Sequence, residues 1–352
     1  MSSKRAEGIR AYILDNVEKY PQGLGSRVAK KFEITRETAS VYLKALVEEG
    51  LLEAKGHTRS KQYKLKTLTD FSVTIPISPE LEEDVLWRTY VAPKLENIRE
   101  NVHHICNYGF TEIVNNAIEH SGGSYIKLGL TRNYKSITMS VEDNGIGIFE
   151  KIMRDFHLED RRHAILELSK GKLTSVESRH SGEGIFFTSR MFRDFRIASL
   201  DLRFAKTRLD GGDFLSEVDQ PSQNMLGTRV MMTIQTDATY TSNDIFSKYT
   251  DDDHRFAKTT IPLKLAKYEG EQLVSRSQAR RLMMRVDRFS EIMLDFAGIA
   301  TIGQAFADEI FRVYAAEHPL VNIRAVGTTD EIDAMIAHAL ANRAEMTSPS
   351  KG

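Results

Sequence analysis

The sequence predicts a multi-domain protein with both helices and strands: a small, mostly helical unit at 1–66, an α+β sandwich at 81–236 and a small α/β unit at 260–344. Three observations lead to this expectation. The length of 352 residues suits two or three domains, and 41% apolar with 28% charged residues is a globular balance. Apolar residues recur with helix or strand periods in three blocks, which are separated by 67–80, a connecting strand or linker, and by the linker 237–259. Residues 345–352 are expected to be a disordered tail.

Charge is distributed unevenly along the chain. Residues 1–66 hold 14 Lys and Arg against 8 Asp and Glu, a net charge of +6, so the remaining 34 basic and 41 acidic residues carry −7. A basic unit on an acidic body indicates a polyanionic partner for that unit alone. We expect a cytoplasmic protein without a membrane partner, because no apolar run is long enough to cross a membrane and Met1–Arg5 leads into no apolar signal segment. The lone Cys106 excludes an intramolecular disulfide.

The N-terminal unit is predicted to contain three helices followed by two strands. Apolar residues recur at helical spacing in 6–19, in 24–32 and from Thr35, a candidate N-cap, to Gly50. Short strands are expected at 51–55 and 62–65 around a polar tip. The run 34–65 resembles bacterial winged helix-turn-helix regulators, and this resemblance implies a DNA-binding unit.

Two groups of polar side chains in this unit are candidates for contacts with double-stranded DNA. The third helix would present Arg36, Ser40 and Lys44 to base edges in the major groove. Arg59 and Lys61, in the wing, would meet phosphates. The alternative is a winged helix that serves dimerisation and whose charges are only solvated.

The middle unit alternates helices and strands in a pattern typical of an α+β sandwich. Residues 81–121 are expected to be mostly helical, with an interruption near Tyr108 and Gly109. Strands are expected at 125–131, 136–142, 195–202 and 228–235, and helices at 148–156, 161–169 and 185–193.

Four motifs follow one another in this unit. The helical run 110–120 has Glu112 and Asn116 on one face. A strand end with a Gly-rich turn (141–148), a Gly-rich helix start (181–186) and a turn entering a strand (226–230) come after it. The order of these motifs resembles the GHKL ATPases, the Bergerat-fold family that includes histidine kinases, type II topoisomerases and anti-sigma-factor serine kinases. This resemblance covers residues 80–236 and implies a site for ATP with Mg²⁺.

At the adenine end of that site, the resemblance assigns a role to four residues. Asp143 would accept a hydrogen bond from the exocyclic amine of adenine, and Thr228 would reach the ring through a water molecule. Gly145 and Gly147 would let the backbone approach the base closely, because glycine has no Cβ.

At the phosphate end, the resemblance makes Asn116 an oxygen ligand of Mg²⁺ and places backbone N–H groups near Gly182 and Gly184 at a helix start. Glu112 is the catalytic candidate, because it lies where related ATPases and serine kinases keep a Glu that activates a water or a hydroxyl. The alternative is a Glu that only orders the shell around Mg²⁺.

The segment between the two Gly-rich motifs corresponds to the family's lid over the phosphates. Lys170 or Lys172 could contact the γ-phosphate, although solvated side chains are the expectation for both. A histidine kinase is set aside, because His103 and His104 lie too close to Glu112 to belong to a separate phosphoacceptor domain.

The C-terminal unit is predicted to have strands at 260–265, 292–296 and 320–326 and helices at 277–285, 305–317 and 330–342. The run 275–319 resembles the STAS-like family DUF4325. In anti-sigma-factor antagonists with a STAS fold, a loop before the corresponding helix carries the Ser that a partner kinase phosphorylates. The run 302–306 has no hydroxyl here, and Thr301 is the nearest candidate, so phosphorylation of this unit is not expected.

Charged side chains cluster in the C-terminal unit. Asp308 and Glu309 suit the first turn of a helix, where they complement its dipole, or could line a site that faces the ATPase lid. A set of arginines could pair with the acidic run 251–253 and comprises Arg276, Arg280, Arg281, Arg285 and Arg288.

The leading interpretation is an ATP-binding, nucleotide-gated DNA-binding regulator of transcription with slow ATP hydrolysis and a possible homodimer. The alternative is a protein whose main activity is enzymatic. It would be a serine/threonine protein kinase of the anti-sigma type, or a phage-defence ATPase, and would use the winged helix for targeting.

Overall fold

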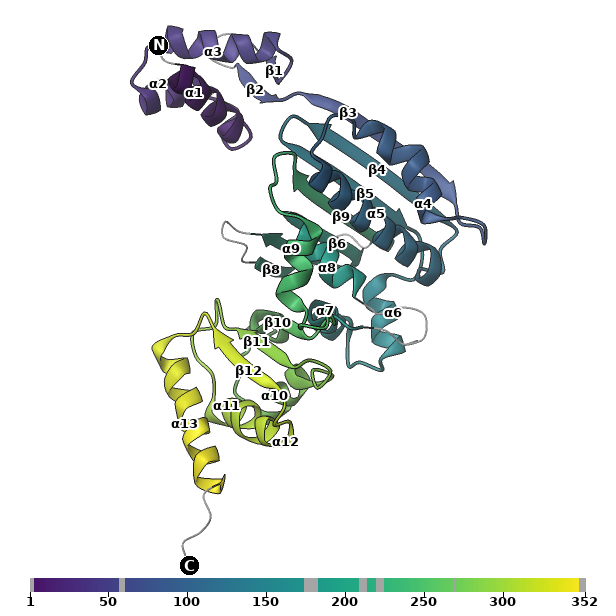
Figure 1. Cartoon of the computed structure of the whole chain (residues 1–352), viewed down its shortest axis with the longest axis vertical. Helices are drawn as coiled ribbons and strands as arrows, with labels where there is room; N and C mark the ends of the chain where they lie inside the picture. The colour runs from purple at the N-terminus through teal and green to yellow at the C-terminus, as the bar shows by residue number, and fades with distance from the viewer. Residues whose placement is uncertain are drawn as a thin grey trace, which may run out of the picture.

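The computed structural model describes residues 3–56, 61–173, 183–208, 214–219, 225–268 and 270–347. Three units lie in a row, with a seven-stranded sheet between an N-terminal and a C-terminal unit (Figure 1). Buried apolar side chains form one cluster in the N-terminal unit and a second that runs through both other units. The middle and C-terminal units therefore share one core.

The N-terminal unit contains the three helices and two strands that the sequence predicts. They are α1 (Ser3–Asn16), α2 (Leu24–Phe32), α3 (Arg36–Glu48), β1 (Leu52–Lys55) and β2 (Gln62–Leu65). The side chain of Thr35 accepts a hydrogen bond from the Thr38 amide at 3.1 Å, so the predicted N-cap is confirmed. The strands β1 and β2 pair antiparallel, and the helices bury Ile9, Val28 and Leu43 among others.

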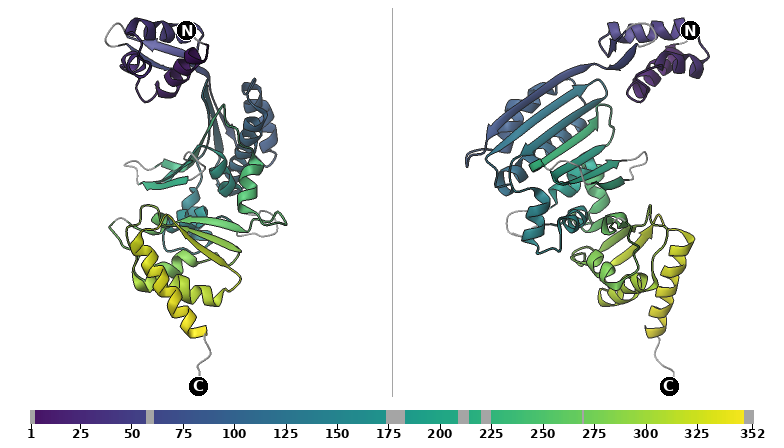
Figure 2. Two further views of the ribbon diagram at one scale, coloured as in Figure 1. Left: turned by 60° about the vertical axis from the view of Figure 1, so that its left-hand side comes forward. Right: turned by 180° about the vertical axis from the view of Figure 1, so that it is seen from behind.

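The middle unit is built on an antiparallel sheet with the order β3-β4-β5-β9-β6-β7-β8. Alternate residues of β5 are buried, and helices cover that face of the sheet (Figure 2). The strands are β3 (Thr67–Pro76), β4 (Tyr125–Asn133), β5 (Ser136–Asp143), β6 (Asp194–Leu200), β7 (Leu202–Arg208), β8 (Phe214–Asp219) and β9 (Met225–Gln235). The helices are α4 (Glu83–Leu86), η2 (Trp87–Val91), η3 (Ala92–Lys94), α5 (Glu100–His120), α6 (Ile148–Asp155), α7 (Arg161–Lys170), α8 (Gly184–Met191) and α9 (Ser242–Tyr249).

The C-terminal unit is a parallel three-stranded sheet, β10-β11-β12, with helices around it. Its strands are β10 (Lys258–Pro262), β11 (Glu291–Asp295) and β12 (Asn322–Val326). Its helices are η4 (Leu263–Ala266), α10 (Arg276–Met283), α11 (Gln304–Asp308), η5 (Glu309–Tyr314), α12 (Ala315–Glu317) and α13 (Asp330–Thr347).

Both segments expected as linkers contain ordered elements. Residues 67–76 form the edge strand β3, because alternate side chains such as Phe71 face the helix layer, where Phe71 stacks on Tyr90 with ring centroids 6.2 Å apart. Residues 242–249 form α9, which a capping box at Thr241 starts and whose Tyr249 is buried. The expected tail begins later than residue 345, since α13 continues to Thr347.

Two expectations about the middle unit are wrong. Helix α5 passes through Gly109 without interruption, because the missing Cβ makes room for a ring: a Cβ there would lie 2.3 Å from Cε2 of Phe192. The single strand expected at 195–202 is a hairpin, β6 and β7, with Leu200 at φ 52° before the turn.

The expected pairing of arginines with the acidic run 251–253 is also wrong. Asp251 and Asp253 pair with the adjacent Arg255. The arginines instead contact carboxylates that lie beside them: Arg280 Nε lies 2.6 Å from Glu309 Oε1 in η5, and Arg281 Nη1 lies 3.1 Å from Glu159 Oε2 in the turn before α7. Glu309 thus serves an ion pair within the C-terminal unit.

Candidate nucleotide site

The last residue of β5, Asp143, has a carboxyl group that is held from two sides. Its Oδ1 accepts hydrogen bonds from the amides of Gly145 at 2.8 Å and Thr228 at 3.3 Å. Sheet register makes this possible, because Asp143 of β5 pairs directly with Thr228 of β9. Two motifs that lie 85 residues apart in the chain therefore meet at one carboxylate.

The second carboxylate oxygen of Asp143 is available to a ligand. Asp143 is only 5% exposed, yet in the part of the chain that the structure describes its Oδ2 has no hydrogen-bond partner. Burial raises the pKa of Asp143, and the hydrogen bonds from Gly145 and Thr228 oppose that rise. A buried acceptor that lacks a donor is what an amine-bearing ligand would satisfy.

Thr228 is held beside Asp143 by the start of α6. Its hydroxyl oxygen accepts a hydrogen bond from the Ile148 amide at 2.9 Å, so its hydrogen can be donated to a ligand or a water. Ser199 of β6 pairs with Thr228 in the sheet and donates to the carbonyl of Gly227 at 3.0 Å. Asp143 of β5, Thr228 of β9 and Ser199 of β6 thus lie side by side across three neighbouring strands.

The two glycines of the turn after β5 are needed because other atoms pack closely against them, which the sequence did not indicate. A Cβ at Gly145 would lie 2.1 Å from the Ser121 carbonyl oxygen, and one at Gly147 would lie 2.6 Å from Ser199 Oγ. Gly147 also has φ 89°, which side chains rarely allow. Both glycines are therefore required by the fold itself, and close approach of a base remains a prediction.

The phosphate end of the candidate site lies where α5 meets the start of α8. The Glu112 carboxylate packs against Gly184, since a Cβ at Gly184 would lie 1.8 Å from Glu112 Oε2. One turn later on α5, Asn116 Nδ2 donates to the Glu112 carbonyl at 2.7 Å, which leaves its amide oxygen as the acceptor. Gly182 lies outside the described residues.

Two further polar residues surround Glu112, and sequence reasoning missed both. Burial, together with the charges of Glu112 and Glu183, raises the pKa of the Tyr108 phenol. Glu183 directly precedes α8 and thus adds a second carboxylate at this end. Tyr108 precedes Glu112 by one helical turn and Glu183 lies between Gly182 and Gly184, so both positions were visible in the sequence, whereas Ser199 becomes a neighbour of the site only through folding.

The expectation of solvated side chains at Lys170 and Lys172 is wrong for Lys170. Lys170 is 1% exposed, and its Nζ donates to Glu167 at 2.6 Å and to the Met284 carbonyl at 3.0 Å. Lys172 is partly buried and donates to the Arg288 carbonyl at 2.8 Å. Both lysines thus bind the C-terminal unit.

The candidate DNA-binding residues lie on an exposed face of the N-terminal unit. Arg36, Ser40 and Lys44 follow one another at four-residue spacing on α3 and are exposed, as is Lys61, which directly precedes β2. Lys44 is within 3.6 Å of Glu48. Arg59 lies outside the described residues.

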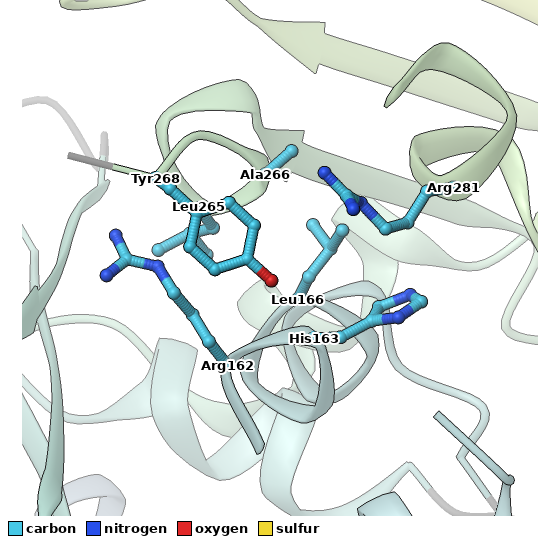
Figure 3. A pocket seen from close by; sticks show the side chains of 7 residues that line it. All are labelled: Arg162, His163, Leu166, Leu265, Ala266, Tyr268 and Arg281. Atoms are coloured by element: carbon cyan, nitrogen blue, oxygen red, sulfur yellow. The ribbon is translucent and has the colours of Figure 1, made fainter. Parts of the chain in front are cut away.

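A small pocket lies between α7 and the C-terminal unit (Figure 3). Arg162, His163, Tyr268 and Arg281 line it together with Leu166, Leu265 and Ala266. His163 is 5% exposed, and neither ring nitrogen has a hydrogen bond, although Nε2 lies 3.5 Å from Glu167 Oε1. The space is the size of a water molecule, so it suits a bridging water and excludes a nucleotide.

Over the described ranges, no group of three or more His, Cys, Asp or Glu side chains could hold a metal ion. A magnesium ion that arrives with a nucleotide needs few protein ligands, because phosphates and waters supply the rest. The helices that the structure describes include none long and apolar enough to span a membrane.

Comparison with known proteins identifies the C-terminal unit. Residues 278–333 match the family model described as "STAS-like domain of unknown function (DUF4325)". The match runs from α10 to the start of α13 and confirms the resemblance predicted from 275–319, so the chain carries a C-terminal STAS-like domain. No curated protein and no solved structure matches the chain.

Proposed function

We propose that the chain is an ATP-binding, DNA-binding regulator of transcription: a GHKL-type middle domain binds ATP with Mg²⁺ and hydrolyses it slowly, and the N-terminal winged helix binds double-stranded DNA. The observation that carries the nucleotide site is Oδ2 of the 5% exposed Asp143, which has no hydrogen-bond partner among the described residues. The exocyclic amine of adenine is a donor of suitable size and charge for it.

The residues present fit ATP at both ends of the site. Asp143 would accept from the adenine amine, and Thr228 would donate through a water to the ring. At the other end, the amides at the start of α8 would bind phosphate oxygens, and Asn116 would give an oxygen to Mg²⁺. Bound Mg²⁺ would neutralise phosphate charge, while Glu112 would accept a proton from the attacking water.

The DNA-binding part of the proposal is supported by charge and exposure. The net charge of +6 in residues 1–66 and the exposed row on α3 match a phosphate backbone and a major groove. The kinase alternative has less support, because the STAS-like domain presents no hydroxyl in 302–306. Incubation with γ-labelled ATP separates the two: free phosphate supports an ATPase, and labelled protein supports the kinase.

The assignment of Asp143 is tested by Asp143→Asn. The amide would turn donors toward the adenine amine, at a cost of about 1–3 kcal/mol, or about one to two decades in ATP affinity by calorimetry. The matched control is Asp219→Asn, which makes the same change at an exposed position of the sheet's far edge strand, β8. Unchanged ATP affinity in Asp143→Asn, or an equal loss in both variants, contradicts the site.

A further inference from the structure

Helix α8 connects the candidate phosphate end of the site with the STAS-like domain. Its first residue, Gly184, touches Glu112, and its last turn carries Arg190, which is 1% exposed. We propose that Arg190 is a positioning residue: through it the STAS-like domain holds α8 in the orientation that presents its first amides to the phosphates of ATP. This inference rests on the proposed nucleotide site and assigns the STAS-like domain a role in it.

The guanidinium of Arg190 contacts carbonyls of α7, α8 and β10, and its carbon lies 5.0 Å from the ring centroid of Tyr249 in α9. Within α8, Nη1 donates to the Phe186 carbonyl at 3.0 Å. Nη2 lies 3.4 Å from the carbonyl of Ser169, at the end of α7, and 3.5 Å from the carbonyl of Thr260, in β10 of the STAS-like domain. Each longer contact is weak alone, but a rigid planar fork of donors reaches both carbonyls together. A lysine ammonium could not span them in the same way.

The STAS-like domain also holds the α7 end that Arg190 contacts. Thr259 Oγ1 donates to the Lys170 carbonyl at 2.7 Å, and Lys170 Nζ donates to the Met284 carbonyl at 3.0 Å. The Ser169 carbonyl is therefore fixed by β10 and by the end of α10. Both acceptors of Nη2 thus depend on the position of the STAS-like domain.

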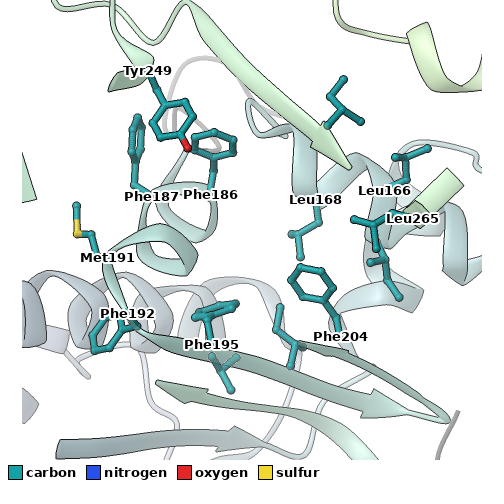
Figure 4. Packing of buried hydrophobic residues seen from close by; sticks show 14 of the residues in the cluster. Leu166, Leu168, Phe186, Phe187, Met191, Phe192, Phe195, Phe204, Tyr249 and Leu265 are labelled. Atoms are coloured by element: carbon teal, nitrogen blue, oxygen red, sulfur yellow. The ribbon is translucent and has the colours of Figure 1, made fainter. Parts of the chain in front are cut away.

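Apolar packing keeps α8 in the core independently of these hydrogen bonds. Phe186 and Phe187 of α8 contact Phe256, with ring centroids 4.5 and 4.9 Å apart, and Figure 4 shows them beside Tyr249 and above Phe195. The Arg190 guanidinium carbon lies 3.2 Å from the Phe186 ring centroid. We therefore expect a conservative change at Arg190 to leave the fold intact and to alter the orientation of α8.

Arg190→Lys in the full chain separates positioning from a merely structural role. Adenosine tests only the adenine end of the site, whereas ATP with Mg²⁺ also tests the amides of α8. We expect calorimetry to show ATP affinity reduced about tenfold, which corresponds to the loss of one or two hydrogen bonds. Adenosine affinity should be unchanged. An equal loss for both ligands, or no loss for either, overturns the proposal. If wild type binds neither ligand, the proposed nucleotide function itself fails.

Two variants complete the test. Arg280→Lys changes an exposed arginine of the same domain that pairs with Glu309, and should alter neither affinity. Thr259→Val keeps the side-chain shape but removes the hydroxyl that holds the Lys170 carbonyl, so it should lower ATP affinity and spare adenosine. Should the unfolding profile of Arg190→Lys differ from that of wild type, Thr259→Val decides: no selective loss of ATP affinity in it overturns the proposal.

Discussion

Two side chains of α5 divide the proposed phosphate chemistry between them. Glu112 lies against Gly184 at the start of α8, whereas Asn116 is one turn further along and has its amide nitrogen bonded to the Glu112 carbonyl. A carboxylate in contact with the phosphate end can accept a proton, and an amide oxygen can ligate a cation but cannot act as a base at neutral pH. Substitutions at the two residues should therefore have different effects on ATP binding and on turnover.

We expect Glu112→Ala to bind Mg²⁺ and ATP with nearly unchanged affinity and to lose turnover, by about two to four orders of magnitude for a general base. Asn116→Ala should instead weaken binding of ATP in the presence of Mg²⁺. Binding is measured by calorimetry and turnover by phosphate release. Glu119→Ala, a change at the more exposed end of the same helix, is the control and should affect neither. Poor binding by Glu112→Ala, together with normal binding and turnover in Asn116→Ala, would show that Glu112 holds the Mg²⁺ and would contradict both assigned roles.

At the scale of elements, α3 owes its suitability for DNA to one buried and one exposed stripe. Ala39, Leu43 and Leu46 face the N-terminal core, whereas Arg36 and Ser40 lie beside this buried stripe and are exposed. The helix can therefore be altered on its outer face without disturbing the core. Substitutions there report on binding rather than on folding.

We expect Arg36→Ala or Ser40→Ala to change which DNA sequences are preferred, since side chains on this face would reach base edges. Lys61→Ala should weaken binding to all sequences alike and reduce the log–log salt slope by about 0.9 per phosphate contact. Salt titrations on promoter and random duplexes measure both effects. Lys248→Ala, the same charge change on exposed α9, is the control. If binding is absent at low salt in wild type, the N-terminal unit is a dimerisation or docking module instead.

At the scale of the whole molecule, the N-terminal unit is joined to the sheet without a flexible linker. Strand β2 ends at Leu65 and β3 begins at Thr67, so Lys66 alone separates them, and its amide donates to the Leu51 carbonyl at 3.0 Å. Asp15 of α1 also pairs with Lys135 between β4 and β5. A change in the sheet on nucleotide binding would therefore reach the N-terminal unit directly.

This connection predicts how the expected effect of ATP on DNA affinity can be removed. Four residues, Gly-Ser-Gly-Ser, inserted after Lys66 should leave ATP affinity and DNA affinity intact but abolish the effect of ATP on DNA affinity, because a flexible segment transmits no orientation. The same insertion after Pro319, next to the 92% exposed Leu320, is the control and should preserve the effect. Gating that persists after the first insertion excludes the β2–β3 connection as its route.

The sequence by itself determined the local elements and the order of the site motifs. Helical spacing and the Thr35 cap located α3, and strand ends with glycines located Asp143 and Thr228, because periodicity, capping and turn formation depend on residues close together in the chain. The resemblance of 275–319 also indicated the STAS-like domain, which the family match places at 278–333.

Only the tertiary structure decided which of these residues meet and which are buried. It placed 67–76 in the sheet, gave Gly145 and Gly147 packing partners, and buried Lys170 and Arg190 between α7, α8 and the STAS-like domain. The physical reason is that burial and strand pairing depend on partners far apart in the chain. A lysine followed by glycine indicates a solvated turn, and only the fold brings to it a carbonyl more than a hundred residues away that accepts its hydrogen bond.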